Sequence, residues 1–267
     1  MKIFRNVACL IFAFLAIPTA FAQKSAVQSI EEYRAMLQDG NPADLFEAKG
    51  EDLWKQKRGP KNASLEKCDL GKGVGVVKGV FVELPRYFAD TNKVQDLESR
   101  LLTCMENLQG FNAVEIAKTP FGKGEQNNMT ALATWISAES KGLRFNLSQT
   151  HSKEKISFEV GKRLFFQRAG PHDFSCASCH GQDGTRIRLQ DLPNLTKNPG
   201  DGVGFAAWPA YRVSNGQMWG MQQRLNDCYR QQRFPYPGFA SDATIALGTY
   251  LGVNSKGSAS VAPAIKR

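Results

Sequence analysis

The residues with the clearest chemistry are Cys176, Cys179 and His180, which form a C-x-x-C-H motif. In this motif the two thiols add to the vinyl groups of a porphyrin, and the adjacent imidazole becomes the proximal iron ligand. A thioredoxin-like redox pair or half of a zinc site would use the same two cysteines. The sequence contains no second C-x-x-C for zinc, however, and a redox pair does not need the histidine. The motif therefore predicts one covalently bound haem c.

The ligand on the second face of the iron decides what such a centre does. Three sulfur-bearing residues downstream are candidates, namely Met218, Met221 and Cys228. Methionine is the usual ligand of electron carriers and raises the reduction potential, whereas a thiolate stabilises ferric iron. We expect a helix over Met218–Arg230. On it Met221, Arg224 and Cys228 share one face, which leaves either sulfur possible as the ligand.

The first 22 residues have the pattern of a secretory signal peptide. Lys2 and Arg5 precede an apolar run over 7–17, and Ala20–Ala22 provides a small-x-small cleavage site. No later segment approaches the ~20 apolar residues that a membrane-spanning helix needs. We therefore expect a soluble periplasmic protein, which agrees with haem c because that group is attached outside the cytoplasm.

Four sequence matches in the same order indicate an internal duplication. Gly50 and Trp54 match Gly161 and Phe165, in each case a glycine followed four residues later by an aromatic residue. The other matches pair Arg100–Cys104 with Arg224–Cys228, Thr134–Ile136 with Thr249–Leu251, and Ser140–Gly142 with Ser255–Gly257. In such a helix the glycine permits a close helix contact, and the aromatic ring packs against the opposing helix.

The duplication predicts a mainly α protein of two tandem cytochrome c-like domains with long loops. We place the first domain over 23–148 and the second over 149–267, with a polar linker near Asn146–Lys155.

The first domain is expected to hold no haem. Leu65 stands where the first haem thiol would fall, and Asp69 occupies the histidine position. Its two cysteines, Cys68 and Cys104, would then lie near the places that a haem thiol and an axial ligand have in the second copy. Because the protein is exported, we expect a disulfide between them rather than two free buried thiols.

Three arguments favour Cys228 over Met221 as the iron ligand. Cys228 is the unpaired fifth cysteine of the exported chain, and an exported protein rarely keeps a reactive thiol without a use. Its counterpart in the first copy, Cys104, sits where an axial group would be. Arg224, one helical turn earlier, can stabilise a thiolate or an approaching anion. His151 and His172 are expected to be surface or loop residues rather than ligands.

Several of these segments together resemble the SoxA family, the catalytic cytochrome subunits of bacterial thiosulfate-oxidising Sox systems. The segments are Gln223–Gln231, Cys176–His180, Arg58–Asn62 and Cys68–Gly71. The resemblance implies a periplasmic L-cysteine S-thiosulfotransferase that pairs with the small cytochrome SoxX. Such an enzyme joins thiosulfate oxidatively to a cysteine of the carrier SoxYZ, and two electrons leave through haem. Many members carry two haems, whereas this chain has one attachment motif, like the single-haem branch.

Carried onto this sequence, the resemblance implies that His180 and Cys228 ligate the iron and that Cys228 also handles sulfur. In this family the cysteine can occur as a persulfide. Arg224 would position and neutralise a sulfonate, and Arg212 is a second candidate for that role. An exposed position or a pairing with a haem propionate would equally account for Arg212.

Three other functions remain open from the sequence. A plain electron-transfer cytochrome would use His180 and Met221 as ligands and would tolerate loss of Cys228. A haem protein that senses or stores a small ligand would have an open or easily displaced sixth position. A docking scaffold, finally, would leave the chemistry to its partner.

The remaining expectations concern charge and the chain ends. Loss of Lys2 and Arg5 would lower the formal net charge from +9 to +7, which favours anionic small molecules or an acidic partner over nucleic acid. A short helix is expected over Ser29–Leu37, and the last helix over Asp242–Leu251, capped by Ser241. The small, polar tail that follows is expected to fray.

Overall fold

The computed structural model describes residues 28, 32, 35, 36, 40–187, 190–197, 203–235 and 237–266. The predicted signal peptide, 1–22, and most of the helix expected over 29–37 lie outside these residues. Within them the chain is mainly helical with three small sheets, and no helix combines the length and apolar character needed to cross a membrane.

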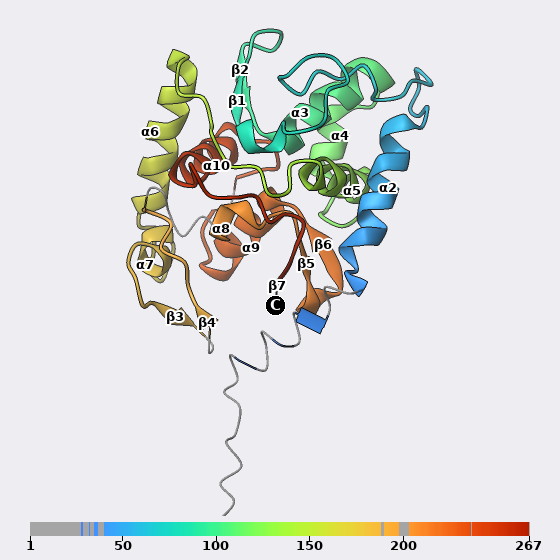
Figure 1. The fold of residues 1–267 in the computed structure, drawn as a ribbon. Helices are drawn as coiled ribbons and strands as arrows, with labels where there is room; N and C mark the ends of the chain where they lie inside the picture. Colours follow the sequence, from blue (N-terminus) through green and yellow to red (C-terminus); the bar gives the residue numbers. More distant parts are fainter. Residues whose placement is uncertain are drawn as a thin grey trace, which may run out of the picture.

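Two pairs of crossing helices form the frame of the molecule (Figure 1). The first pair is α2, Ala43–Lys55, with α5, Gly124–Ala138. The second pair is α6, Ser152–Phe166, with α10, Asp242–Asn254. Each pair contains one copy of the glycine–aromatic match, so the repeat in the sequence corresponds to two equivalent helix pairs in the structure.

A glycine stands where the helices of each pair cross. A Cβ atom on Gly50 would clash with the backbone carbonyl of Ala131 in α5. In the same way, a Cβ atom on Gly161 would clash with the backbone carbonyl of Ala246 in α10. The two helices of each pair therefore touch backbone to backbone, which any larger residue would prevent.

The aromatic residue four positions after each glycine packs beside the same crossing. The ring centroids of Trp54 and Trp135 lie 5.7 Å apart in the first pair. Those of Phe165 and Tyr250 lie 5.1 Å apart in the second. Because rings at this spacing interact favourably, the two crossings have the same packing as well as the same sequence pattern.

Shorter elements complete the first domain between α2 and α5. They are η2 (Phe81–Glu83), β1 (Arg86–Phe88), β2 (Lys93–Gln95), α3 (Leu97–Cys104), η3 (Met105–Gln109) and α4 (Ala113–Lys118). Strands β1 and β2 form an antiparallel hairpin. Helix α3 begins at a capping box in which the carboxylate of Asp96 accepts the backbone N–H of Ser99 at 2.8 Å, and it continues into the π-helical turn η3.

The second domain places its short elements between α6 and α10 and after α10. They are α7 (Cys176–His180), β3 (Arg186–Ile187), β4 (Gln190–Asp191), α8 (Val203–Ala206), β5 (Ala210–Arg212), η4 (Val213–Asn215), β6 (Gln217–Trp219), α9 (Met221–Gln231) and β7 (Ala264–Lys266). Strand β5 is central in a three-stranded sheet, antiparallel to β6 and parallel to β7.

One apolar core runs through both domains. Phe145, which is 1% exposed, lies near the middle of the chain and joins the two halves. Its ring meets Phe81 of the first domain at 5.5 Å and Phe205 of the second at 5.4 Å, both edge to face. The two halves therefore share one core, and the predicted linker is partly ordered structure because α6 already begins at Ser152.

Two sequence expectations about the second domain were wrong. Met218 is not in a helix but in β6, where it pairs with Tyr211 of β5, and α9 begins only at Met221. The tail does not fray, because β7 pairs with β5 and Ile265 is 5% exposed. Both errors concern strand pairing with β5, which local sequence does not reveal. The last helix begins after Ser241 as expected but runs on to Asn254.

Candidate functional site

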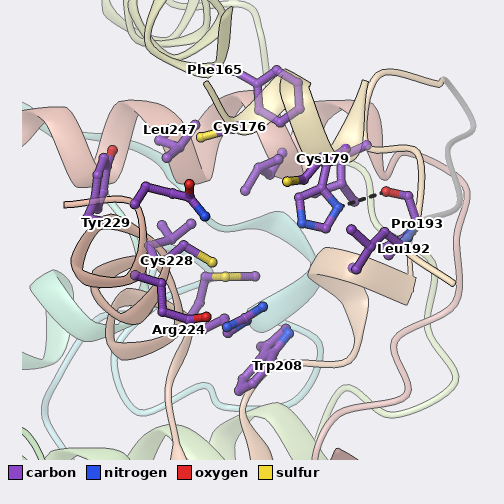
Figure 2. A pocket seen from close by; sticks show the side chains of 18 of the residues that line it. Phe165, Cys176, Cys179, Leu192, Pro193, Trp208, Arg224, Cys228, Tyr229 and Leu247 are labelled. Carbon is purple, nitrogen blue, oxygen red and sulfur yellow. Dashed lines mark hydrogen bonds between the residues drawn. The ribbon is translucent and has the colours of Figure 1, made fainter. Parts of the chain in front are cut away.

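A cavity of about 630 Å³ lies in the second domain and is walled by α6, α7, α9, α10 and β5 (Figure 2). Its walls are mostly apolar; the apolar residues include Phe165, Leu192, Leu195, Leu225, Leu247 and Leu251. Seven residues that the sequence analysis selected as candidate site residues line this one cavity: Cys176, Cys179, His180, Arg212, Met221, Arg224 and Cys228. They come from three elements, since α7 provides three of them, β5 one and α9 three.

Helix α7 presents the C-x-x-C-H motif to the cavity. It is a short helix held by a capping box, in which Ser175 and Ser178 each accept the other's backbone N–H, at 3.0 and 3.2 Å. Because residues three apart in a helix lie on one face, both thiols of the motif point to the same side. Figure 2 shows the sulfur atoms of Cys176 and Cys179 directed into the cavity.

His180 is held in one orientation by the backbone. Its Nδ1 donates a hydrogen bond to the carbonyl oxygen of Pro193 at 2.9 Å, which leaves Nε2 free to face the cavity. Burial lowers the pKa of His180, and the positive charge of Arg224 lowers it further. The hydrogen bond to Pro193 raises this pKa in part. A neutral imidazole fixed through its other nitrogen is the arrangement that metal-binding histidines adopt.

The thiol of Cys228 lies across the cavity from α7, on the inner face of α9 (Figure 2). Within the described part of the chain, Cys176, Cys179 and Cys228 form no disulfide. Burial raises the pKa of Cys228, while the nearby charges of Arg224 and Arg212 lower it in part. In the protein without a bound group, burial thus raises the pKa of Cys228 more than the charge of Arg224, the residue that the sequence analysis selected to stabilise its thiolate, lowers it. A bound metal reverses the balance, because a coordinating thiol is deprotonated outright.

Arg224 is braced beside the thiol by an acidic residue. Its Nη1 lies 3.3 Å from Oδ2 of Asp227, one turn further along α9. Asp227 is 10% exposed at its side chain and also accepts hydrogen bonds from Arg230 and Gln231, both at 2.7 Å. The guanidinium of Arg224 lies 5.8 Å from the ring centre of Trp208. Figure 2 shows it directed toward the same space as Cys228.

Arg212 approaches the same place from β5. Its guanidinium lies 5.2 Å from the ring centre of Trp219. Burial lowers the pKa of Arg212, and the positive charge of Arg224 lowers it further. Its Nε is buried without a hydrogen-bond partner among the described residues. Two arginines that repel each other, one with a buried donor unsatisfied, form a place where an anion would be stabilised.

The alternative ligands fall into two groups. Met221 lines the cavity, so the structure leaves a methionine within the site. Met218 is 2% exposed in β6 and is not among the residues that line it. His151 caps α6 and stacks on Tyr87 with ring centroids 3.6 Å apart, which gives it a structural role. His172 is exposed in the loop before α7.

The cavity fits haem c on several independent grounds. Its volume lies within the ~300–1,000 Å³ typical of small-molecule and cofactor sites. The walls are apolar, two thiols stand at one edge, and an oriented neutral imidazole stands beside them. Cys176, Cys179 and His180 are the residues that would hold the group.

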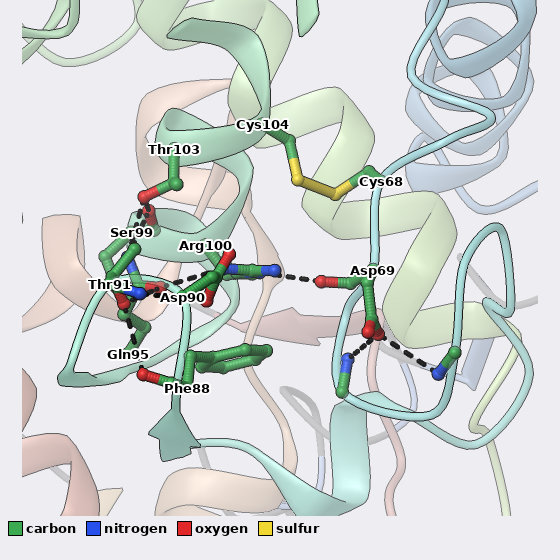
Figure 3. A network of polar contacts seen from close by, with 12 residues as sticks. Cys68, Asp69, Phe88, Asp90, Thr91, Gln95, Ser99, Arg100, Thr103 and Cys104 are labelled. Carbon is green, nitrogen blue, oxygen red and sulfur yellow. Dashed lines mark hydrogen bonds and ion pairs between the residues drawn. A yellow bond between two sulfur atoms is a disulfide. The ribbon is translucent and has the colours of Figure 1, made fainter. Parts of the chain in front are cut away.

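In the first domain, a disulfide and a network of polar contacts occupy the region around Cys104 and Arg100, the counterparts of Cys228 and Arg224 (Figure 3). A disulfide joins Cys68 and Cys104 across 5.6 Å between Cα atoms, the pairing expected from the sequence. Arg100, the counterpart of Arg224, donates from Nε to the carbonyl oxygen of Asp69 at 2.6 Å and from Nη1 to the carboxylate of Asp90 at 2.8 Å. The side chain of Asp69 instead accepts backbone N–H groups of its own loop.

Sequence reasoning missed three contributors to the site. Asp227 could have been found, because an acid three residues after an arginine on a helix is a common pair. The Pro193 carbonyl and Trp208 gave no such signal, since each reaches the cavity through a loop whose path depends on the whole fold.

The fold and the site define a c-type cytochrome, and comparison with known proteins specifies the kind. The model of the SoxA/TsdA cytochrome c domain family matches residues 49–145 and 160–259, which are the two halves of the duplication. The chain belongs to the SoxA family.

Relatives with this name extend over most of the chain. The L-cysteine S-thiosulfotransferase subunit SoxA of Hydrogenophilus thermoluteolus is 55% identical over 245 residues, which are 92% of this chain and 90% of the relative. The protein of the same name from Hydrogenobacter thermophilus is 34% identical and aligns over 85% of this chain and 82% of its own. The crystal structure of SoxXA from P. pantotrophus has the same fold, with a TM-score of 0.73 at 23% identity, covering 88% of this chain and 84% of that chain.

Proposed function

We propose that the protein is the catalytic cytochrome subunit of an L-cysteine S-thiosulfotransferase. It would couple thiosulfate oxidatively to a cysteine of the carrier protein SoxYZ in the periplasm. The observation that carries this proposal is the position of Cys228 in the cavity of the C-x-x-C-H motif, where the charges of Arg224 and Arg212 act on its thiol. Relatives that bear this activity in their name support it.

The chain would hold a single haem c. Cys176 and Cys179 would attach it, and His180 and Cys228, which line the same cavity, would bind its iron. The disulfide and the buried Arg100 occupy the equivalent region of the first domain, which supports a first domain without haem. When bound, the haem supplies a route by which electrons leave the site.

The sulfur chemistry would use Cys228 as a transient carrier. Its thiolate and the outer sulfur of thiosulfate would form a sulfur–sulfur bond, and the two electrons released would pass to an external acceptor. The carrier's cysteine thiolate then attacks the sulfur that bears the sulfonate. The bond to Cys228 breaks, the thiolate of Cys228 leaves with its electron pair, and the carrier keeps the S-thiosulfonate.

The two arginines would bind the sulfonate. Asp227 holds the guanidinium of Arg224 beside the thiol, so this charge is already in position before thiosulfate binds. Arg212 offers a buried, unsatisfied N–H. Because both charges act at a largely apolar site, their effect on an anion is stronger than it would be in water.

The partner that takes the electrons would be the small cytochrome SoxX. The structure of similar fold is described as that of a SoxXA complex, which supports a two-subunit assembly for this chain as well. Export by the predicted signal peptide would bring all components into the periplasm.

The direct test compares Cys228→Ala with Met221→Leu in the holoprotein. With thiosulfate, SoxYZ and an electron acceptor, we expect the first variant to lose roughly a thousandfold or more of the rate. Met221→Leu, which changes another residue of the same cavity wall, should keep most of it. Mass spectrometry of the carrier cysteine measures the product. Unimpaired coupling by Cys228→Ala would contradict the proposal.

A plain electron-transfer cytochrome is the second candidate, because Met221 lines the cavity. In that case Met221→Leu, and not Cys228→Ala, would remove an iron ligand and change the reduction potential.

A further inference from the structure

Helix α9, which carries both central residues of the proposed site, has no side-chain cap of its own. Its N-cap residue is Gly220. In the duplication register that pairs Arg100 with Arg224, the counterpart of Gly220 is Asp96, which caps α3 through the backbone N–H of Ser99. The second copy therefore lacks the cap that the first copy has.

The first domain supplies the missing cap. Glu98 Oε2 accepts the backbone N–H of Gln222, in the first turn of α9, at 3.1 Å. Asp96 Oδ2 accepts the side-chain amide of Gln222 at 2.8 Å. The amide oxygen of Gln222 in turn accepts the backbone N–H of Ala240, in the segment that leads into α10, at 2.7 Å. Glu98 is 8% and Gln222 1% exposed, so water does not substitute for these bonds.

The absence of a side chain at Gly220 makes this contact possible. A Cβ atom there would lie 2.9 Å from Cδ of Glu98 and closer still to its carboxyl oxygen. The φ of Gly220 is −76°, an ordinary value for any residue. Glycine is therefore needed here for room, not for backbone freedom.

We propose that Glu98 is a positioning residue of the sulfur-transfer site, because it caps α9 across the domain interface and fixes Arg224 and Cys228 in the cavity. The first domain thus has a role in the reaction without holding a reacting group. The link to Cys228 chemistry rests on the proposed function, whereas the cap itself does not.

The first experiment is hydrogen–deuterium exchange of the holoprotein, read on peptides that cover α9. Glu98→Ala should raise amide exchange in α9 about fivefold, the change expected when a helix loses one cap. Glu98→Gln keeps an oxygen that can accept the N–H of Gln222, and it should restore slow exchange.

Glu125→Ala is the matched control. Glu125 lies in α5, and its partly buried carboxylate pairs with Arg58 at 2.6 Å. The substitution therefore removes a different carboxylate of the first domain. It should leave the α9 peptides unchanged. Unchanged exchange in Glu98→Ala, or an equal increase in Glu125→Ala, would overturn the inference.

A double-mutant cycle tests the contact from the other side. Gly220→Ala alone should loosen α9, because the new methyl group displaces Glu98. In the Glu98→Ala background the same substitution should have little effect, since the obstacle is gone. Additive effects would show that the two residues act independently, contrary to the inference.

The effect on the site is measured separately, by ferric haem EPR and by the rate of thiosulfate coupling. Glu98→Ala should broaden the low-spin signal and lower kcat about fivefold while KM stays within twofold, and Glu98→Gln should restore both. If α9 loosens but signal and kcat do not change, Glu98 is not a positioning residue. If the wild type itself does not turn over thiosulfate, the proposed function fails while the exchange result still decides the cap.

Discussion

At the scale of single residues, the proposed chemistry depends on charges placed beside the partly buried thiol of Cys228. Cys228 has a raised pKa in the protein alone because burial outweighs the arginines. The site thus does not keep a reactive free thiolate, and coordination to iron is what would produce one. A protonated thiol at this position is slow to oxidise when no partner is bound.

Arg224 is predicted to contribute through its charge and its fixed position. Arg224→Ala should lower kcat/KM for thiosulfate about a hundredfold, the typical loss of one preorganised group that stabilises charge. Arg224→Lys should retain only part of the wild-type kcat/KM, because a lysine cannot reproduce the contact with Asp227 in the same geometry. Steady-state kinetics measure both.

Arg230→Ala provides the control for that prediction. Arg230 also pairs with Asp227, at 2.7 Å, but its side chain is 66% exposed and it does not line the cavity. Its loss should change kcat/KM less than threefold, in line with the small value of exposed ion pairs. An equal loss in both variants would indicate that Asp227, rather than Arg224, is what matters.

At the scale of elements, the crossing of α6 with α10 shapes the cavity, because Phe165, Leu247 and Leu251 of these helices line it. Gly161→Ala should destabilise the protein by about 1–3 kcal/mol, because the new methyl group overlaps the carbonyl of Ala246. Without such a clash, replacing a glycine in the middle of a helix by alanine stabilises the protein by up to about 1 kcal/mol. A loss of stability in Gly161→Ala would therefore indicate the close helix contact.

Thermal unfolding measures the effect, and Gly238→Ala is its control. Among the residues that the structure describes, none has an atom within 4 Å of the place where a Cβ on Gly238 would stand. This substitution should be neutral or slightly stabilising. If Gly161→Ala also stabilised the protein, the close crossing of α6 with α10 would be wrong.

The cap on α9 predicts a pH dependence of stability. Burial raises the pKa of Glu98 to about 8 from 4.5, with a contribution from Asp96, and the N–H of Gln222 opposes the shift. The folded protein therefore holds this proton more tightly than the unfolded chain does. The resulting stabilisation is complete below about pH 4.5 and is lost as the pH rises through about 8.

Glu98→Gln removes the titrating group, so its free energy of unfolding should fall less than that of the wild type between about pH 5 and about pH 9. Denaturant unfolding at a series of pH values checks this. Parallel curves for the two proteins would show that Glu98 does not titrate in this range.

The elements show where sequence reasoning succeeds and where it stops. The C-x-x-C-H helix, the paired glycines and the disulfide partners follow from local spacing and from the repeat. The strand that contains Met218 and the ordered tail do not, because both exist only through pairing with β5. The bond from Glu98 to Gln222 joins residues 124 positions apart and had no local signal at all.

At the scale of the whole molecule, the duplication has led to two different uses of one fold. The second copy keeps a cavity, and its arginine and cysteine line it. The first copy buries the equivalent arginine and joins its cysteine to another. The first copy also shares an apolar core with the second copy and caps its helix α9.

The disulfide is predicted to stabilise this support. Its cysteines are 36 positions apart, so closing the loop is worth about 3–4 kcal/mol in the chain-entropy model. The double variant Cys68→Ala, Cys104→Ala should therefore unfold at a clearly lower denaturant concentration. The haem spectrum of the folded variant should stay unchanged, because neither residue touches the cavity. A changed spectrum would mean that the first domain senses its disulfide at the haem.

The most direct test of the central claim is the ferric EPR and optical spectrum of the mature holoprotein, recorded for the wild type and Cys228→Ala together with intact masses. Ligation of a single haem iron by Cys228 predicts the added mass of one haem and a low-spin thiolate signal that Cys228→Ala abolishes. A methionine–iron band in the far red that persists in Cys228→Ala would contradict it, because Cys228 would then be neither the iron ligand nor the sulfur-handling group.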